Sequence, residues 1–169
     1  VILAGGSGTR LLPLTQKIPK PMIKINNIYF LEYLIDELKR NEFKEVLILT
    51  GYKNHVIENY FKDGSDHEIK ISYDFQPSEC DTGLRLRMAF NKLHDYFFLQ
   101  YCDNYIPFNI NTMIESFNDL KKDLMISIYD NLDNYSKNNV FYNNEKYLEI
   151  YDKKRNCLLY TSPSPRDAT

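Results

Sequence analysis

The 169-residue chain lacks the features that mark several classes of protein. No apolar run approaches the roughly 20 residues that cross a bilayer, and no signal-peptide pattern opens the sequence. Basic residues do not outnumber acidic ones, because the net charge at pH 7 is −2. We therefore expect neither a membrane nor a nucleic acid as a partner, and the cytoplasm is the predicted location.

Close pairs of metal-binding or disulfide-forming residues are also missing. The cysteines are odd in number and far apart, at Cys80, Cys102 and Cys157, and we interpret them as free thiols. The three histidines share no ligand spacing such as i, i+4. The sequence therefore predicts no zinc site.

Composition and length fit one globular domain. Hydrophobic residues make up 43% of the chain and charged residues 26%, and 169 residues suffice to bury a sizeable core. The chain starts at Val1 rather than at a methionine, and residues 1–156 are rich in Asn, Lys, Tyr and Ile. Residues 157–169 instead resemble a translated sequencing adapter, the alternative being a Ser/Pro-rich linker. We expect 1–156 to be the amino-terminal part of a truncated domain, with 157–169 outside its fold.

Apolar runs alternate with amphipathic stripes along the chain. The runs predict strands at residues 46–49, 69–73, 97–101 and 124–129. The stripes predict helices at residues 30–38, 56–61, 84–93 and 113–120. This alternation predicts an α/β fold, a Rossmann-like three-layer sandwich with a mainly parallel mixed sheet that is incomplete on its carboxy-terminal side.

A glycine-rich turn at residues 5–10 follows a predicted buried strand at residues 1–4. Glycine has no Cβ to block a ligand, so backbone N–H groups in such a turn can approach an anion closely. The turn ends in Arg10, which adds a positive charge. The combination indicates a phosphate site.

Two common phosphate-binding motifs do not fit this turn. A Walker loop needs a lysine directly after Gly8, and the residue there is threonine. A dinucleotide fingerprint needs a third glycine at Leu11 and a helix at once, which Pro13 and Pro19 would break. What remains is an irregular loop of about twenty residues that holds Arg10 and Lys20 near the glycines, and loops of that length are usually functional or disordered.

Residues 3–22 read Leu-Ala-Gly-Gly-Ser-Gly-Thr-Arg-Leu-Leu-Pro-Leu-Thr-Gln-Lys-Ile-Pro-Lys-Pro-Met. This run resembles, at every fixed position, the signature of the nucleotidyltransferases that make nucleotide sugars. The resemblance implies transfer of a nucleoside monophosphate from a nucleoside triphosphate to a sugar 1-phosphate, with Mg²⁺ as cofactor and pyrophosphate as the second product. It extends loosely over most of residues 1–156 and looks most similar to guanylyl- or cytidylyltransferases acting on heptose or hexose 1-phosphates.

The resemblance also implies a set of nucleotide-binding residues. They are Leu3, Ala4, Gly5, Gly6, Gly8, Thr9, Gln76 and Gly83. The Gln76 amide can donate and accept at once, as the reading of a base edge requires, while Gly83 opens a helix that could lie against the ring. Arg85 and Arg87 follow on that helix and either reach a phosphate or face water, so the identity of the base stays open.

Asp103 ends a hydrophobic strand, where a carboxylate has to cap a turn or hold a metal. In the family this position binds Mg²⁺, and Cys102 stands where relatives usually have glycine. The implied catalytic residues are Arg10, Lys20 and Asp103. Arg10 would hold the β- and γ-phosphates as a fork, and Lys20 would lie nearer the α-phosphoryl group.

The sugar phosphate is expected near Asn104, Asp152 and Lys153, although a solvated charge run explains the last two equally well. Two alternatives remain open: transfer to a phosphorylated alcohol such as phosphocholine, and a nucleotide-sensing subunit that has lost the chemistry. The sequence does not determine the oligomeric state, and a homo-oligomer is among the options. As a fragment the chain itself is expected to be inactive.

Overall fold

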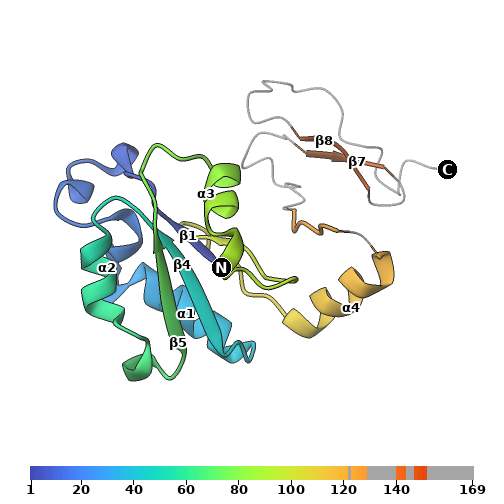
Figure 1. Ribbon diagram of the computed structural model, residues 1–169, viewed down its shortest axis with the longest axis horizontal. Helices are drawn as coiled ribbons and strands as arrows, with labels where there is room; N and C mark the ends of the chain where they lie inside the picture. The colour runs from blue at the N-terminus through green and yellow to red at the C-terminus, as the bar shows by residue number, and fades with distance from the viewer. Residues whose placement is uncertain (122, 129–139, 144–146, 152–169) are drawn as a thin grey trace. The chain divides into compact units, whose positions relative to one another are not determined.

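A computed structural model describes residues 1–121, 123–128, 140–143 and 147–151. The chain divides into two compact units, residues 1–113 and residues 114–169. The first unit holds the main sheet and the glycine-rich loop (Figure 1). No helix in the described part of the chain is long and apolar enough to span a bilayer.

The main sheet has four parallel strands in the order β5-β4-β1-β6. These are β1 Ile2–Ala4, β4 Glu45–Thr50, β5 Lys70–Phe75 and β6 Gln100–Tyr101. The central strand β1 pairs Ile2 with Ile48 on one side and with Gln100 on the other. The strands predicted at residues 1–4, 46–49 and 69–73 are thus confirmed.

The strand predicted at residues 97–101 is shorter than expected. Only Gln100 and Tyr101 pair with β1, through Ile2 and Leu3. Because β1 has three residues, it offers the incoming strand few backbone partners. The apolar run that precedes Gln100 therefore contributes side chains to packing without extending the ladder.

Helices cover both faces of the sheet, as the predicted three-layer sandwich requires. Helices α1 (Phe30–Arg40) and α2 (Asn54–Phe61) contribute Leu34 and Ile57 to a core that also contains Ile48. Helix α3 (Thr82–Met88) is followed by Ala89, which packs on the other face against Leu49. The alternation of side chains along β4 supplies both faces, and Figure 1 shows α2 and α3 on opposite sides of the sheet.

The predicted helix at residues 84–93 divides into two pieces. Helix α3 ends at Met88, and a 3-10 turn, η5, covers Phe90–Lys92. The loop that follows β1 contains only three further 3-10 turns, η1 Thr9–Leu11, η2 Leu14–Gln16 and η3 Lys20–Met22. A two-stranded ribbon, β2 Lys24–Ile25 with β3 Ile28–Tyr29, leads into α1, and η4 covers Ser65–His67.

Helix α4 (Ile110–Leu120) begins in the first unit and ends in the second, as the stripe at 113–120 predicts. The second unit also contains an antiparallel pair, β7 Val140–Tyr142 and β8 Leu148–Tyr151. The strand predicted at residues 124–129 is wrong over its described part, because residues 124–128 form no strand. Leu124 is 74% exposed, so this run has neither a paired neighbour nor a covered face among the described residues.

Candidate active site

The strand order creates a crevice at the carboxyl ends of β1 and β6. From β1 the chain steps outward through β4 to β5, and then returns through α3 to β6 on the far side of β1. Loops that leave two such strands diverge, and ligands bind in the opening between them. The glycine-rich loop follows β1, and Cys102 and Asp103 follow β6.

Lys20 and Asp103 meet at this crevice although they are far apart in the sequence. Lys20 Nζ donates to Asp103 Oδ2 at 2.6 Å, and the two side chains are 29% and 36% exposed. Lys20 opens η3, which is anchored by the buried side chain of Met22. The pair lines a cavity of about 150 Å³ together with Leu11, Ile23, Ile25, Phe30 and Cys102.

Cys102 is held directly beside this pair. Its backbone N–H donates to the Leu3 carbonyl at 3.2 Å and so continues the pairing of β6 with β1. Burial raises the pKa of the Cys102 thiol to about 12, and the neighbouring Asp103 carboxylate acts in the same direction. The thiol is therefore neutral near pH 7 and supplies no nucleophile.

A short relay fixes the shape of the glycine-rich loop. The Tyr52 hydroxyl donates to the Thr15 carbonyl at 3.0 Å, and the Thr15 hydroxyl donates to the Gly8 carbonyl at 3.0 Å. Gly8 itself has φ of 64°, which favours glycine, and a Cβ there would lie 3.1 Å from Lys20 Cβ. The two hydrogen bonds thus connect Gly8 to the turn after β4, and Gly8 lies against Lys20.

The remaining residues predicted on this loop differ in exposure. Leu3, Ala4 and Gly5 are buried at the end of β1, whereas Gly6, Thr9 and Arg10 are exposed. Arg10 lies in η1 and makes no hydrogen bond or ion pair with a described residue. Arg10 therefore forms no bond with Lys20 or Asp103, and its guanidinium is open to a ligand.

Gln76 lies below the rim rather than on it. Its side chain is 0% exposed, and Nε2 donates to Asp74 Oδ2 at 2.7 Å and to the Arg85 carbonyl at 2.9 Å. Both partners are acceptors, which fixes the orientation of the amide. The sequence predicted an amide that donates and accepts, but only Oε1 lacks a partner among the described residues. Only the accepting half is available to a base.

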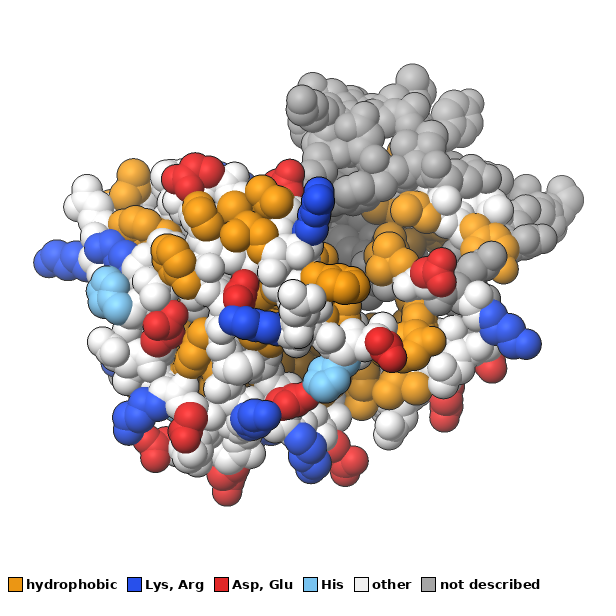
Figure 2. All heavy atoms as spheres, viewed as in Figure 1, with side chains coloured by type: hydrophobic (Ala, Val, Ile, Leu, Met, Phe, Trp, Pro, Cys, Tyr) orange, Lys and Arg blue, Asp and Glu red, His pale blue; other side chains and the backbone are white. Residues whose placement is uncertain are grey.

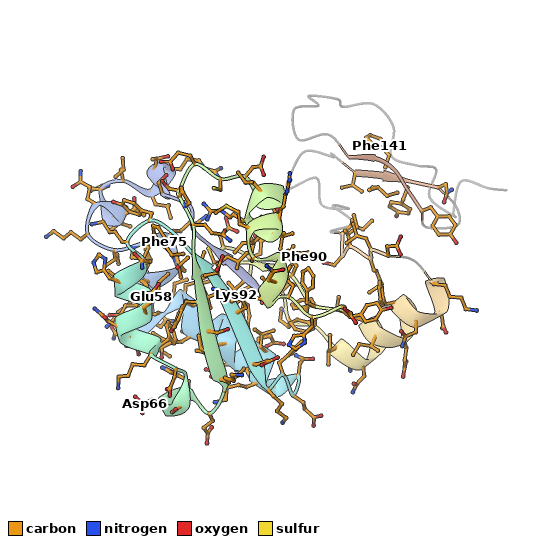
Figure 3. The ribbon with its side chains drawn as sticks, in the orientation of Figure 1. Glu58, Asp66, Phe75, Phe90, Lys92 and Phe141 are labelled. Carbon is orange, nitrogen blue, oxygen red and sulfur yellow. The ribbon has the colours of Figure 1, made fainter. Side chains whose placement is uncertain are left out.

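Asp74, one of the partners of Gln76, is itself held by an ion pair. Lys92 Nζ lies 2.5 Å from Asp74 Oδ1. Figure 3 labels Lys92 in η5 and Phe75 at the carboxyl end of β5, where Phe75 is 62% exposed. The ion pair connects η5 to β5, the strand that Gln76 follows.

Helix α3 begins at the same rim. The Asp81 side chain accepts a hydrogen bond from the Leu84 N–H at 2.8 Å and so caps the helix. Gly83 in its first turn is exposed, and the Thr82 and Tyr101 hydroxyls lie 3.4 Å apart. The start of α3 is thus placed beside the end of β6.

The two arginines of α3 have opposite environments. Arg87 is exposed, but Arg85 is 5% exposed and lies against Gly5. The sequence contains one sign of this difference, since Arg85 precedes the buried Ala89 by four residues and so shares its helix face. Sequence reasoning left Arg85 as either a phosphate ligand or a solvated side chain, and the structure excludes the second.

The residues at the cavity fit a Mg²⁺ ion that would take most of its ligands from a bound nucleotide. The described part of the chain contains no cluster of three or more metal-binding side chains, and Asp103 is the carboxylate that lines the cavity. Mg²⁺ commonly takes one or two carboxylates and completes its shell with phosphate oxygens and water. Asn104 next to Asp103 is exposed, while Asp152 and Lys153 lie outside the described residues.

Fold and rim together define an α/β protein with an ion pair and a glycine-rich loop beside its central strand. Residues 1–137 match the nucleotidyl transferase family, and the chain belongs to that family. On the face seen in Figure 2, acidic and basic side chains are interspersed rather than gathered by sign. The match over residues 1–137 confirms the family predicted from the sequence.

Three relatives illustrate the similarity. The chain is 32% identical over 140 residues to the D-glycero-alpha-D-manno-heptose 1-phosphate guanylyltransferase of Campylobacter jejuni, covering 83% of this chain and 62% of that protein. The structure of HddC from Yersinia pseudotuberculosis complexed with GMP-PN is 28% identical, has a TM-score of 0.62, and is matched over 70% of this chain and 53% of its own.

The third is the CTP:phosphocholine cytidylyltransferase of Streptococcus pneumoniae, 28% identical with a TM-score of 0.53. It is matched over 64% of this chain and 46% of its own. The chain thus spans between about half and two thirds of the length of these relatives.

Proposed function

We propose that the chain forms the nucleotide-binding part of an enzyme that transfers a nucleoside monophosphate from a nucleoside triphosphate to a sugar 1-phosphate. The main support is the Lys20–Asp103 pair, which places a cation and a carboxylate 2.6 Å apart beside the glycine-rich loop. Family membership and the guanylyltransferase relatives support the same reaction class. The base and the sugar are left to experiment.

In this reaction an oxygen of the sugar 1-phosphate attacks the α-phosphorus of the nucleotide. A new P–O bond forms, and the bond from the α-phosphorus to the bridging oxygen breaks, so pyrophosphate leaves with that electron pair. The attacking phosphate is already ionised and needs no general base. Catalysis then depends on position and on charge stabilisation.

The chain's own cations fit these needs. Arg10 is exposed, pairs with no described residue, and would hold the β- and γ-phosphates as a fork, stabilising the departing pyrophosphate. Lys20 would exchange Asp103 for the α-phosphoryl group or the incoming sugar phosphate. When bound, Mg²⁺ would be held by Asp103 and would neutralise phosphate charge. The reaction would take place in the cytoplasm, where nucleoside triphosphates are available.

Pyrophosphate release by the complete protein tests this proposal. Four nucleoside triphosphates are crossed with a panel of sugar 1-phosphates in the presence of Mg²⁺. We expect Lys20→Met and Asp103→Asn each to lower turnover at least a hundredfold for the productive pair, because each removes charge stabilisation at the reacting phosphate. Lys17→Met is the matched control, since Lys17 is an exposed lysine of the same loop.

Phosphocholine belongs in the same panel, because one structurally similar protein is a phosphocholine cytidylyltransferase. Release only with CTP and phosphocholine would select that second reaction. Nucleotide binding without release for any pair would indicate the nucleotide-sensing subunit instead. In that case Lys20→Met would change only affinity.

A further inference from the structure

Arg85 is a buried cation that forms no ion pair with a described residue. The residue is 5% exposed, and no described carboxylate lies within ion-pairing distance of its guanidinium. A buried charge is strongly unfavourable unless it is paired or fully hydrogen-bonded. The environment of Arg85 therefore calls for a further partner.

Three of its hydrogen bonds are already made to one loop. Nε donates to the Cys80 carbonyl at 3.1 Å, and Nη2 donates to the carbonyls of Pro77 and Ser78 at 2.9 and 3.2 Å. These bonds shape residues 77–80, which follow Gln76. Nη1 is buried and has no partner among the described residues. Protein carbonyls therefore accept from Nε and Nη2, whereas Nη1 of the same guanidinium has no acceptor among the described residues.

The unpartnered nitrogen faces the start of the glycine-rich loop. A Cβ built on Gly5 would lie 2.0 Å from Nη1 and 2.5 Å from Cζ, so the guanidinium lies against the Gly5 backbone. Gln76 is adjacent, because its Nε2 donates to the Arg85 carbonyl, and its Oε1 is likewise unpartnered. A buried donor and a buried acceptor thus both lack a described partner near the carboxyl ends of β1 and β5.

We propose that Arg85 is a nucleotide-binding residue whose Nη1 donates to an oxygen of the bound nucleotide beside Gly5, either a phosphate oxygen or a carbonyl oxygen of the base. This inference rests on the proposed function. A phosphate would supply the missing counter-charge, and a base carbonyl would complement the acceptor of Gln76. Because Nη1 is buried in this structure, a nucleotide oxygen can reach it only after the residues that cover it move.

Calorimetric titration of the complete protein distinguishes the two possible acceptors, a phosphate oxygen and a carbonyl oxygen of the base. The probes are the nucleoside triphosphate that the wild type uses and the matching nucleoside, with Arg85→Met compared with Arg87→Met. Arg87 is the control because it is an exposed arginine on the same helix. We expect Arg85→Met to weaken triphosphate binding about tenfold to a hundredfold, as the loss of a charge-assisted hydrogen bond implies, and Arg87→Met to leave it within about twofold.

The nucleoside identifies the bonded oxygen. Unchanged nucleoside affinity in Arg85→Met assigns the bond to a phosphate, whereas an equal loss for both probes assigns it to the base. Unchanged affinity for both probes, with only a lower melting temperature, would overturn the inference and leave Arg85 a residue that shapes the loop. Absence of pyrophosphate release in the wild type would contradict the proposed function and not the binding role.

Arg85→Met can also fail to fold, because it removes three hydrogen bonds from the 77–80 loop. The wild-type protein with ¹⁵N-labelled arginine then provides the test. Adding the triphosphate is expected to shift the Arg85 side-chain resonance and to slow exchange of its protons. An Arg85 resonance unmoved at saturating nucleotide would refute the inference.

Discussion

Gly8 is the residue on which the shape of the phosphate loop depends most directly. Its φ of 64° lies in the left-handed region, and the space beside it is filled by Thr15 and Lys20. Other glycines of the turn differ, since a Cβ on Gly6 would meet nothing within 4 Å. Gly8 therefore combines a left-handed backbone conformation with close neighbours around the place of a Cβ.

Gly8→Ala is expected to lower the free energy of unfolding by about 1–2 kcal/mol, because alanine is strained at this φ and its Cβ would press on Thr15 Cγ2. Chemical denaturation measures the change, with Gly6→Ala as the matched control for stability. Equal losses in both variants would show that the strain at Gly8 is not the cause. Nucleotide affinity should fall in Gly8→Ala as well, because Lys20 would be displaced.

At the scale of elements, the glycine-rich loop is held by the turn that follows β4. Tyr52 in that turn donates to Thr15 of η2, and its own N–H donates to the Gly5 carbonyl at 3.2 Å. The neighbouring Lys53 donates to the Gln16 carbonyl. A loop without α-helix thus obtains its order from a neighbouring strand end.

Tyr52→Phe removes the hydroxyl and leaves the Thr15 carbonyl without that donor. We expect a loss of about 1 kcal/mol in stability and faster proteolysis within residues 9–19, because the anchor of η2 is gone. Limited proteolysis with mass spectrometry locates the cleavage. Tyr33→Phe is the control, since it deletes a hydroxyl that bonds Ile25 at 3.1 Å in the ribbon instead. Cleavage of the loop in both variants alike would rule out a specific anchor.

At the scale of the whole molecule, the sequence predicts the layers of helices and sheet better than it predicts the extent of the edge strand β6. Buried strands such as β4 and the stripe of α1 are local patterns, and both could be predicted from residue periodicity. The two-residue length of β6 depends on how much of β1 is available for pairing, which no local pattern contains. Likewise, Lys20 was predicted from its motif, but its bond to Asp103 results from the strand order.

Buried polar groups explain the other differences. The sequence suggests rim positions for Gln76 and Arg85, yet both are buried. Gln76 donates to the Arg85 carbonyl, and the Arg85 guanidinium donates to carbonyls of residues 77–80. Such networks form only after the surrounding elements have packed, so composition and spacing do not reveal them. The apolar run at 124–128 shows the converse, since hydrophobicity alone did not produce a strand there.

We propose that residues 1–156 carry the fold and that residues 157–169 add nothing to it. A variant that ends at residue 156 is then expected to have the melting temperature of the 169-residue chain within about 1 °C, because the proposal assigns no core contact to the final residues. Differential scanning calorimetry of the two chains makes the comparison. A drop of several degrees would show that the final 13 residues, 157 to 169, take part in the fold.

The central position of β1 also bears on how the chain acquires its site during synthesis. Residues 2–4 leave the ribosome before their partners, since Ile2 pairs with Ile48 and with Gln100, which follow much later. Pairings that distant in sequence form slowly, and nascent chains fold from the amino terminus as segments emerge. Strand β1 therefore keeps one open edge until β6 docks, and only then is the cavity that Lys20 and Asp103 line completed. Translation speed through residues 50–103 thus sets how long that edge stays exposed to misassociation.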